Sequence, residues 1–306
     1  MSNRRHPILT VLVIILVIAL VLGSAMVITL NMLSPSSDLF FTEKIGIISV
    51  EGTISASQTV TSQLVKYRKD KDIKAIILKI NSPGGTIAPT QEIYREIQKT
   101  IPVKKVVAAM GTVAASGGYY IAAAANKIVA NPGTITGSIG VIMEFVRVEE
   151  LLNKIGVDLE IMKSGEFKDI GSPDRKLTKR EREILDAMIM DMQKQFVEAI
   201  VRGRSLSLEK VQAIADGRIF SGARAKELGL VDFLGNFQDA VEITKELAGI
   251  KGDVTLVYPK KSKLGLFDFL LESSAKFAVR LIQNLRGTIV EYRWSGISGL
   301  NVRESY

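Results

Sequence analysis

The feature that most limits the fold of this chain is a repeated order of apolar run, small-residue turn and helix. The runs Ile45–Val50, Ile73–Ile80 and Val103–Ala109 have the length and the β-branched composition of buried strands. A helix is predicted after the second run, over Ala88–Ile101, and another after the third, over Tyr119–Ala125. Such alternation predicts an α/β fold with a parallel sheet covered by helices.

Further elements are predicted in the second half of the chain. Thr178 stands where an N-cap is expected, with Glu181 at the capping-box position, and apolar residues at helical spacing continue that helix to about Arg202. The other expected elements are strands over 127–130, 157–162 and 254–258 and helices over 148–155, 207–216, 221–228 and 237–247.

The N-terminal segment Ile8–Leu33 carries no charge and is long enough to cross a bilayer as a helix. Arg4 and Arg5 precede it, so the positive-inside rule predicts a single-pass anchor in the cytoplasmic (inner) membrane, with the N-terminus in the cytoplasm and the bulk of the chain outside. A cleaved signal peptide with small residues at 23–25 is the alternative. The anchor is favoured because the apolar run continues through Met26–Leu33.

Composition excludes several classes of site. The chain has no cysteine, which rules out disulfides and thiolate catalysis, and its only histidine is His6. We therefore expect no metal and no cofactor. The net charge of +8 comes from interleaved acidic and basic residues without an aromatic-studded basic patch. Nucleic acid is not an expected partner, whereas the lipid bilayer is.

Ser116 is the candidate nucleophile. It lies between small residues and two glycines directly after an apolar run, a layout that lifts a hydroxyl out of a strand-to-helix turn with N–H groups beside it. His6 precedes the predicted anchor and cannot activate it, so lysine is the leading candidate for the base. The pKa of a lysine must fall from about 10.4 to about 7–8 for this role, which burial among apolar groups supplies.

The sequence offers more than one lysine and more than one set of backbone donors. Lys168 lies in a glycine-flanked segment after a predicted strand, but spacing alone does not choose it over Lys163. Gly84 and Gly85 follow a strand and open a helix, which exposes N–H groups to an anion or forms an ordinary turn. Ser138 stands in a third small-residue turn, where it orients a lysine amine or only satisfies its own backbone.

Taken together, five motifs resemble the signal peptide peptidase A family, in its short single-repeat form, within the Clp-protease/crotonase superfamily. The resemblance covers about residues 45–248, and all five motifs occur in the family's order. They are Asn81–Gly85, Met110–Tyr120, Thr136–Val141, Lys163–Asp169 and Ala215–Phe220.

The resemblance implies a fold of repeated β-β-α units with a helical extension, and a serine endopeptidase that works through a Ser/Lys dyad and an acyl-enzyme. Its implied substrates are peptides, namely remnant signal peptides or other apolar peptides. It also implies a ring-shaped homo-oligomer in which the lysine reaches the serine of a neighbouring subunit. The implied roles are nucleophile for Ser116, general base for Lys168, orientation of that lysine for Ser138, and oxyanion hole for Gly85 or Gly84 together with Gly117.

The domain division follows from these points. We expect a cytoplasmic N-terminus over 1–7, the transmembrane anchor over 8–33, a linker over 34–44, the peptidase domain over 45–258, and a C-terminal extension over 259–306. An amphipathic helix is predicted over 266–285 in that extension, either on the membrane surface or against the body of the protein.

Three alternatives remain open at this point. One is a related membrane protease that acts on a regulatory membrane protein. Another is a crotonase-type acyl-CoA enzyme that uses the same oxyanion hole. The last is a non-enzymatic membrane scaffold.

Overall fold

The computed structural model describes residues 7–33, 42–259 and 290–293, with side chains over 14–26, at 29 and over 42–259. Most of the predicted linker and the predicted amphipathic helix over 266–285 lie outside these residues. The chain divides into two compact units, Met1–Thr42 and Glu43–Tyr306.

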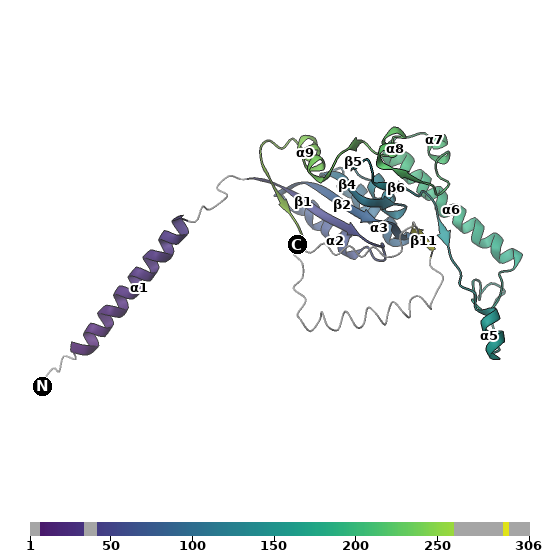
Figure 1. The fold of residues 1–306 in the computed structure, drawn as a ribbon, viewed down its shortest axis with the longest axis horizontal. Coiled ribbons are helices and arrows are strands. Elements are labelled where there is room, and N and C mark those ends of the chain that lie inside the picture. The colour runs from purple at the N-terminus through teal and green to yellow at the C-terminus, as the bar shows by residue number, and fades with distance from the viewer. Residues whose placement is uncertain (1–6, 34–41, 260–289, 294–306) are drawn as a thin grey trace. The chain divides into compact units, whose positions relative to one another are not determined.

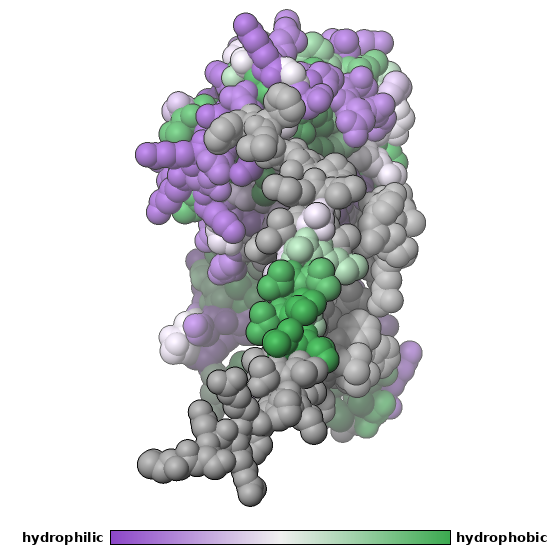
Figure 2. Space-filling model, turned by 90° about the vertical axis from the view of Figure 1, so that its left-hand side faces the viewer, coloured by the Kyte–Doolittle hydropathy of each residue, from purple (hydrophilic) through white to green (hydrophobic). Residues whose placement is uncertain are grey.

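The first unit contains one described helix, α1, over Pro7–Leu33. This confirms a helix in the segment predicted as an anchor. Its described side chains are exposed, and those of 14–22 form the bright green surface in Figure 2. Judged on the residues that the structure describes, no helix is both long and apolar enough to cross a membrane.

The second unit is built on a parallel sheet, as predicted. Its strands follow the order β10-β1-β2-β4-β5-β9, and every neighbouring pair in that order is parallel. Their bounds are β1 Glu43–Glu51, β2 Ile73–Ser82, β4 Lys105–Ala115, β5 Lys127–Ala130, β9 Phe233–Leu234 and β10 Val254–Val257.

Helices cover both faces of this sheet, so its central strands are apolar on both sides. Along β2, Ile76, Leu78 and Ile80 pack into the larger core, whereas Ile77 packs into the smaller one. The larger core is covered by α2 (Gln58–Lys69), α3 (Ile87–Thr100), α4 (Gly117–Ala123) and part of α6 (Lys179–Arg204), and the smaller by α9 (Phe237–Ala248) (Figure 1).

Short strands surround the carboxyl end of β4, and the sequence did not predict them. β6 (Ile135–Gly137) pairs with the end of β4 and with β8 (Ile219–Ser221). A separate three-stranded sheet contains β3 (Gly84–Thr86), β11 (Val290–Arg293) and β7 (Ile142–Met143), with β11 in the middle. Each of these strands is too short to give a periodic signal in the sequence. Each also depends on pairing with residues that are distant in the chain.

Beyond β7 the chain forms an extension with α5 (Glu149–Ile155) and an irregular segment that leads into α6 (Figure 1). The strand predicted over 157–162 is wrong. Gly156 ends α5 in the left-handed conformation, and residues 157–162 form neither strand nor helix and are exposed. Their apolar side chains therefore face outward in the single chain.

The helices predicted in the second half of the chain are present, but their ends differ from the predicted ones. The capping box of Thr178 and Glu181 begins α6, as predicted. The remaining helices are α7 (Leu208–Gln212), shorter than the predicted 207–216, and α8 (Gly222–Glu227), close to the predicted 221–228.

Candidate active site

Ser116 occupies a strained turn between β4 and α4. Its φ is 52° and its ψ is −115°, a combination that a residue with a side chain rarely adopts. Backbone bonds hold it there: its N–H donates to the carbonyl of Gly137 at 2.8 Å, and its carbonyl accepts from the N–H of Tyr120 at 2.8 Å. Strand, sharp turn and helix in this order are the geometry that presents a nucleophilic serine in other hydrolases.

The hydroxyl of Ser116 is buried and has no hydrogen-bond partner in the part of the chain that the structure describes. The residue as a whole is 1% exposed. A buried hydroxyl without a partner is costly, because it has lost its water and gained nothing in exchange. Strain and a missing partner at one serine are the marks of a functional site.

Close packing requires glycine at position 118. A Cβ at Gly118 would lie 2.7 Å from the carbonyl oxygen of Ser82, a contact that real side chains essentially never make. Because Gly117 and Gly118 begin α4, their N–H groups have no partner within that helix. The helix therefore offers backbone donors directly beside the Ser116 hydroxyl.

Gly84 and Gly85 differ in what their N–H groups can do. The N–H of Gly84 donates to the hydroxyl of Ser82 at 3.1 Å. The carbonyl of Gly84 and the N–H of Thr86 both bond to Ile54, at 2.9 and 2.8 Å. Because polar groups alternate along a strand, the N–H and C=O of Gly85 face the opposite edge. Of the two glycines, Gly85 is the one whose N–H is turned away from Ser82 and Ile54, toward the edge where β11 lies.

Only glycine fits at position 85. A Cβ there would lie 2.2 Å from the carbonyl oxygen of Ile54. β3 thus lies directly against the segment at residue 54 on one edge and pairs with β11 on the other.

Ser138 lies next to the serine turn. Gly137 pairs with Ala115 across β6 and β4, so Ser138 and Ser116 are the residues that follow a paired position on neighbouring strands. Ser138 also has a positive φ, of 50°, and is 7% exposed, and its N–H donates to the carbonyl of Arg218 at 2.8 Å. The structure therefore brings Ser138 together with Ser116, Gly117 and the Ser82–Gly85 turn.

Lys168 is not part of this group. It lies in a turn of the extension, where its N–H donates to the carbonyl of Gly165 at 3.2 Å, and its side chain is exposed. No described contact within one chain links it to Ser116.

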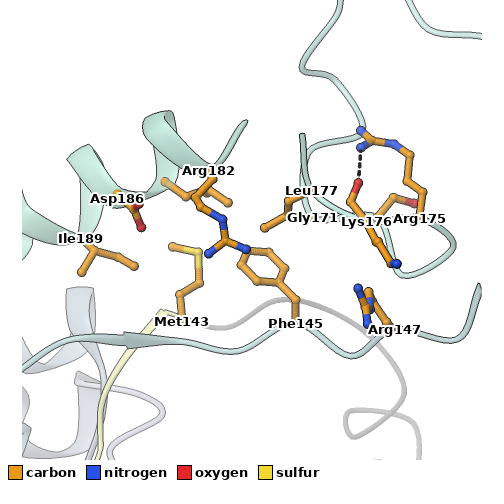
Figure 3. A pocket seen from close by; sticks show the side chains of 12 residues that line it. Met143, Phe145, Arg147, Gly171, Arg175, Lys176, Leu177, Arg182, Asp186 and Ile189 are labelled. Atoms are coloured by element: carbon orange, nitrogen blue, oxygen red, sulfur yellow. Dashed lines mark hydrogen bonds between the residues drawn. The ribbon is translucent and has the colours of Figure 1, made fainter. Parts of the chain in front are cut away.

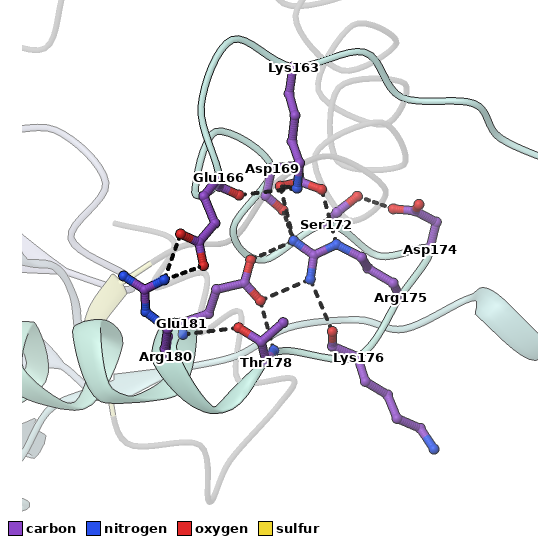
Figure 4. Close-up of polar contacts among 10 residues, drawn as sticks. All are labelled: Lys163, Glu166, Asp169, Ser172, Asp174, Arg175, Lys176, Thr178, Arg180 and Glu181. Carbon is purple, nitrogen blue, oxygen red and sulfur yellow. Dashed lines mark hydrogen bonds and ion pairs between the residues drawn. The ribbon is translucent and has the colours of Figure 1, made fainter.

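A network of charged side chains fixes the turn that carries Lys168 (Figure 4). Asp169, the next residue, accepts from the Nε of Arg175 at 3.0 Å and from the Nζ of Lys163 at 2.7 Å. Arg175 also donates to the Oε2 of Glu181 at 2.8 Å. Glu181 is the capping-box residue of α6, so Arg175 ties the turn to the start of that helix.

The pKa values of the acids in this network report strong pairing. Hydrogen bonds from Arg175, followed by the backbone bond from Thr178, lower the pKa of Glu181 to about 2. Bonds from Arg175 and then Lys163 hold the pKa of Asp169 well below its usual range. Glu181 is 2% exposed, so it is a buried carboxylate that depends on its partner.

A hollow of about 400 Å³ lies between residues 143–147, the 171–177 loop and the first turns of α6 (Figure 3). Its apolar side chains are Met143, Phe145, Leu177, Leu185 and Ile189, and its charged ones are Arg147, Arg175, Lys176, Arg182 and Asp186. Cations outnumber acids there, so the hollow disfavours a basic group.

Known proteins with related sequences identify the family. The model of peptidase family S49 matches residues 98–251, and that of Clp protease matches residues 33–134. A candidate protease from Methanocaldococcus jannaschii is 32% identical over 87% of this chain and 89% of its own length. The chain belongs to peptidase family S49.

Two further relatives agree with this assignment. A candidate protease from Synechocystis sp. is 46% identical to this S49 chain over 69% of it and 76% of its own length. A candidate signal peptide peptidase SppA from Enterococcus faecium is 38% identical over 68% of this chain and 60% of its own length. This S49 protein is a serine peptidase, and its α/β fold with a parallel sheet fits the Clp-protease class. Neither the acyl-CoA enzyme nor the scaffold alternative fits this result.

Sequence reasoning did not single out several residues that shape the S49 site. Ser82 was noted only as part of a turn, although its hydroxyl engages Gly84 and also donates to the carbonyl of Gly52 at 2.6 Å. Arg175 was missed altogether. The only sequence signal was its position between Asp169 and Glu181, six residues from each.

Proposed function

We propose that this chain is a membrane-anchored serine endopeptidase in which Ser116 and Lys168 form a catalytic dyad, and that it degrades remnant signal peptides or similar apolar peptides. The observation that carries the proposal is the hydroxyl of Ser116, buried without a described partner on a strained turn at the start of α4, whose first N–H groups have no partner within the helix. A serine hydroxyl in this position needs a base that accepts its proton before the oxygen can act as a nucleophile.

The proposed reaction uses these groups in order. The neutral amine of Lys168 accepts the hydroxyl proton while the Ser116 oxygen attacks the peptide carbonyl carbon. The N–H groups of Gly85 and Gly117 hold the resulting oxyanion. The C–N bond then breaks as Lys168 returns the proton to the leaving amine, which leaves an acyl-enzyme. Water, deprotonated by the same amine, attacks the acyl carbon; the ester bond to Ser116 breaks as Lys168 returns the proton to the serine oxygen, and the acyl group leaves as a carboxylic acid. Ser138 orients Lys168 throughout.

The base is proposed to come from a neighbouring copy of the chain. Lys168 is exposed in one chain, whereas a lysine that acts as a base must be desolvated. The extension around it exposes apolar side chains that a second copy would cover, with Met162 at 94% exposure as the extreme. The extension also exposes Val146, Leu151, Ile155 and Leu159.

The anchor, the localisation and the substrate class stay part of the proposal. The uncharged segment Ile8–Leu33 supports a single span in the cytoplasmic membrane with the peptidase domain, residues 45–258, outside the cytoplasm. The relative named for signal peptide peptidase activity supports signal peptide remnants as substrates. A related protease acting on a regulatory membrane protein would use the same dyad.

The test is a set of single and mixed variants of the full chain. Ser116→Ala and Lys168→Ala should each lower peptide cleavage by about 10⁴-fold or more while the protein stays folded. Lys154→Ala, which removes another exposed lysine of the extension, is the matched control and should cleave normally. Normal turnover by Lys168→Ala would refute the dyad.

Mixing the two inactive variants tests whether the site is shared. A neighbour that supplies Lys168 to a chain with an intact Ser116 restores one working site, so co-assembled Ser116→Ala and Lys168→Ala chains should regain part of the activity. Crosslinking must first show that mixed assemblies form. Mixed assemblies without any activity would place both groups of the dyad in one chain.

A further inference from the structure

Gln193 is a glutamine of α6 that the proposed reaction does not use. Its side-chain Nε2 donates to the carbonyl of Ala215 at 2.7 Å and to the carbonyl of Ile139 at 3.3 Å. Both partners are carbonyls, so the amide must turn its nitrogen toward them. Ile139 directly follows Ser138 in the chain, and Gln193 therefore reaches from the helix to the turn that carries Ser138.

The backbone of that turn is strained and is held from outside. Gly137 and Ser138 both have a positive φ, of 79° and 50°, which glycine adopts freely and serine does not. The N–H of Ser138 donates to the carbonyl of Arg218 at 2.8 Å, and the N–H of Gly217 donates to the carbonyl of Ile139 at 3.1 Å. These two bonds continue the antiparallel pairing of β6 with β8 past Gly137.

The amide of Gln193 bridges the two paired segments beyond these bonds. The carbonyl of Ile139 accepts from both Gly217 and Gln193, and the carbonyl of Ala215, two residues before Gly217, accepts from the same amide. One side chain thus ties together both segments next to Ser138. Loss of the amide should loosen the backbone of Ser138 from the side of Ile139.

The other polar atom of this amide carries a cost. The Oε1 of Gln193 is buried and has no hydrogen-bond partner in the part of the chain that the structure describes. A buried acceptor without a partner is unfavourable, and an apolar side chain of similar size would avoid that penalty. The glutamine is therefore better explained by what its nitrogen holds than by a gain in stability of its own.

The backbone that carries Gln193 is firmly packed. Phe196, in the next turn of α6, is fully buried in the larger core, and Met192 packs against that core. Glu181, at the start of α6, lies about 18 Å away along the axis, at about 1.5 Å per residue. A change at Gln193 should thus act on the Ser138 turn and leave the charged network around Lys168 in place.

We propose that Gln193 is a positioning residue for the proposed reaction, and that it holds the turn of Ser138 where the Ser138 hydroxyl can orient the amine of Lys168. The inference rests on the proposed function for the role of Ser138. Serine has a single side-chain torsion between its backbone and its oxygen, so the position of the backbone determines where that oxygen can lie. The two bonds from one amide to the segments on either side of the turn are the observation that carries the proposal.

The first experiment is a double-mutant cycle in the full chain. Gln193→Leu removes the amide and keeps a side chain of similar size. We expect its kcat for an apolar peptide to fall by about tenfold with KM unchanged, since misplacing a group at the site slows the reaction without weakening binding. Ser138→Ala should lower kcat at least as much. The double variant should be no slower than Ser138→Ala, because Gln193 acts only through Ser138.

The matched control is Gln195→Leu. Gln195 lies on the same helix, where it accepts from Gln91 at 2.8 Å and donates to Asp191 at 2.9 Å, and it should keep the native kcat. Losses that multiply in the double variant would show that Gln193 acts by another route, and a native kcat in a folded Gln193→Leu chain would show that it has no role. Either result overturns the proposal. Full activity of Ser138→Ala would remove Ser138 from the proposed function and this inference with it.

The second experiment does not depend on catalysis. In a Ser116→Ala chain, Gln193→Leu should speed hydrogen exchange of the amides of Ser138 and Gly217 by about tenfold, since both donate next to the bridge that is lost. Exchange in β1, in β2 and over 163–175 should not change. Unchanged exchange at both amides, or equal acceleration throughout the sheet, overturns the positioning role. Cleavage that survives Ser116→Ala overturns the proposed function instead, so the two failures are separate results.

Discussion

Ser116 and Lys168, the two residues of the proposed dyad, are held by different forces. Ser116 ends a strand of the parallel sheet, is 1% exposed and is fixed by backbone bonds to Gly137 and Tyr120. Lys168 lies on an extension without a core of its own, where charged side chains hold its turn. The comparison shows that the serine turn is fixed by contacts within a single chain, whereas Lys168 is exposed and has no described contact with that turn.

The same contrast separates stability from activity. Substitutions near Ser116 disturb close packing in the sheet, and therefore should change both folding and catalysis. Substitutions in the extension should change catalysis while the sheet stays folded. Four predictions test this division, beginning with the largest effect.

Gly85→Ala should be the most damaging substitution of the four. Its Cβ would lie 2.2 Å from the backbone of Ile54, so β3 must move and the Gly85 N–H moves with it. We expect kcat/KM to fall by about 10²–10³-fold, as after loss of an oxyanion donor, together with a lower Tm. Steady-state kinetics and thermal unfolding measure the two effects.

The control for this prediction is Gly133→Ala. A Cβ at Gly133 meets nothing within 4 Å, and the residue has no positive φ. Both its rate and its Tm should stay near those of the native chain. A native rate for Gly85→Ala would show that β3 does not contribute to the oxyanion hole.

Arg175→Ala should separate activity from stability. The change leaves Asp169 with Lys163 as its remaining cation and leaves the buried carboxylate of Glu181 without its guanidinium, so the Lys168 turn loses its link to α6. Misplacing a catalytic group by about 1 Å costs up to about 10²-fold, and we expect kcat to fall by about 10- to 100-fold with little change in KM. Arg175→Lys should restore only part of the rate, because an ammonium lacks the paired donors of guanidinium.

The matched control is Arg180→Ala. Arg180 pairs with Glu166 at 2.8 Å, but both side chains are largely exposed, so the pair contributes little. The kcat of Arg180→Ala should be close to that of the native chain. Should Arg175→Ala keep the native kcat, or lose kcat only in proportion to folded protein, the network would have no role in positioning Lys168.

The parallel sheet was predictable because its strands are buried on both faces and stand out as apolar runs. The serine turn was predictable because only small residues tolerate such packing, and Ser116 stood alone among them. The capping box at Thr178 is equally local, since both of its partners lie within four residues.

The failures have a common physical origin. Residues 157–162 include four apolar residues but are exposed. An apolar segment predicts that its surface is covered, but it does not show whether the chain's own sheet or another surface covers it. β3, β7 and β11 exist only through pairing between segments far apart in the chain, which no local pattern encodes. The choice between Gly84 and Gly85 likewise required the positions of Ser82 and Ile54.

Acid should loosen the extension before the sheet. The pKa of Glu181 is lowered to about 2 in the folded chain, against an ordinary value of 4.5. The unfolded extension therefore binds more protons between these values, so the stability that Glu181 contributes is complete above about pH 4.5 and is lost as pH falls toward 2. The protection of amides in residues 163–181, measured as exchange rates corrected for their intrinsic pH dependence, should fall between about pH 4.5 and pH 2, while protection in β1 and β2 stays high.

Glu181→Gln removes this titration and should flatten the pH dependence of exchange in the extension. Glu166→Gln, which neutralises an exposed carboxylate of the same network, should leave it as in the native chain. Identical pH dependence in the sheet and the extension would mean that the two regions unfold as one unit.

The smallest effect is expected from Thr178→Ala, at the start of α6. The hydroxyl of Thr178 accepts from the N–H of Glu181 at 3.2 Å, and its loss costs about 1 kcal/mol of local stability. The far end of α6 is held by Phe196 and Ile200 in the larger core, and does not depend on the cap. Exchange should therefore accelerate in the first turns of α6 and not near residue 196, and Thr178→Ser should restore the native pattern. Acceleration along the whole helix would place the extension and the sheet in a single cooperative unit, and the contrast between Ser116 and Lys168 would then be one of position and not of stability.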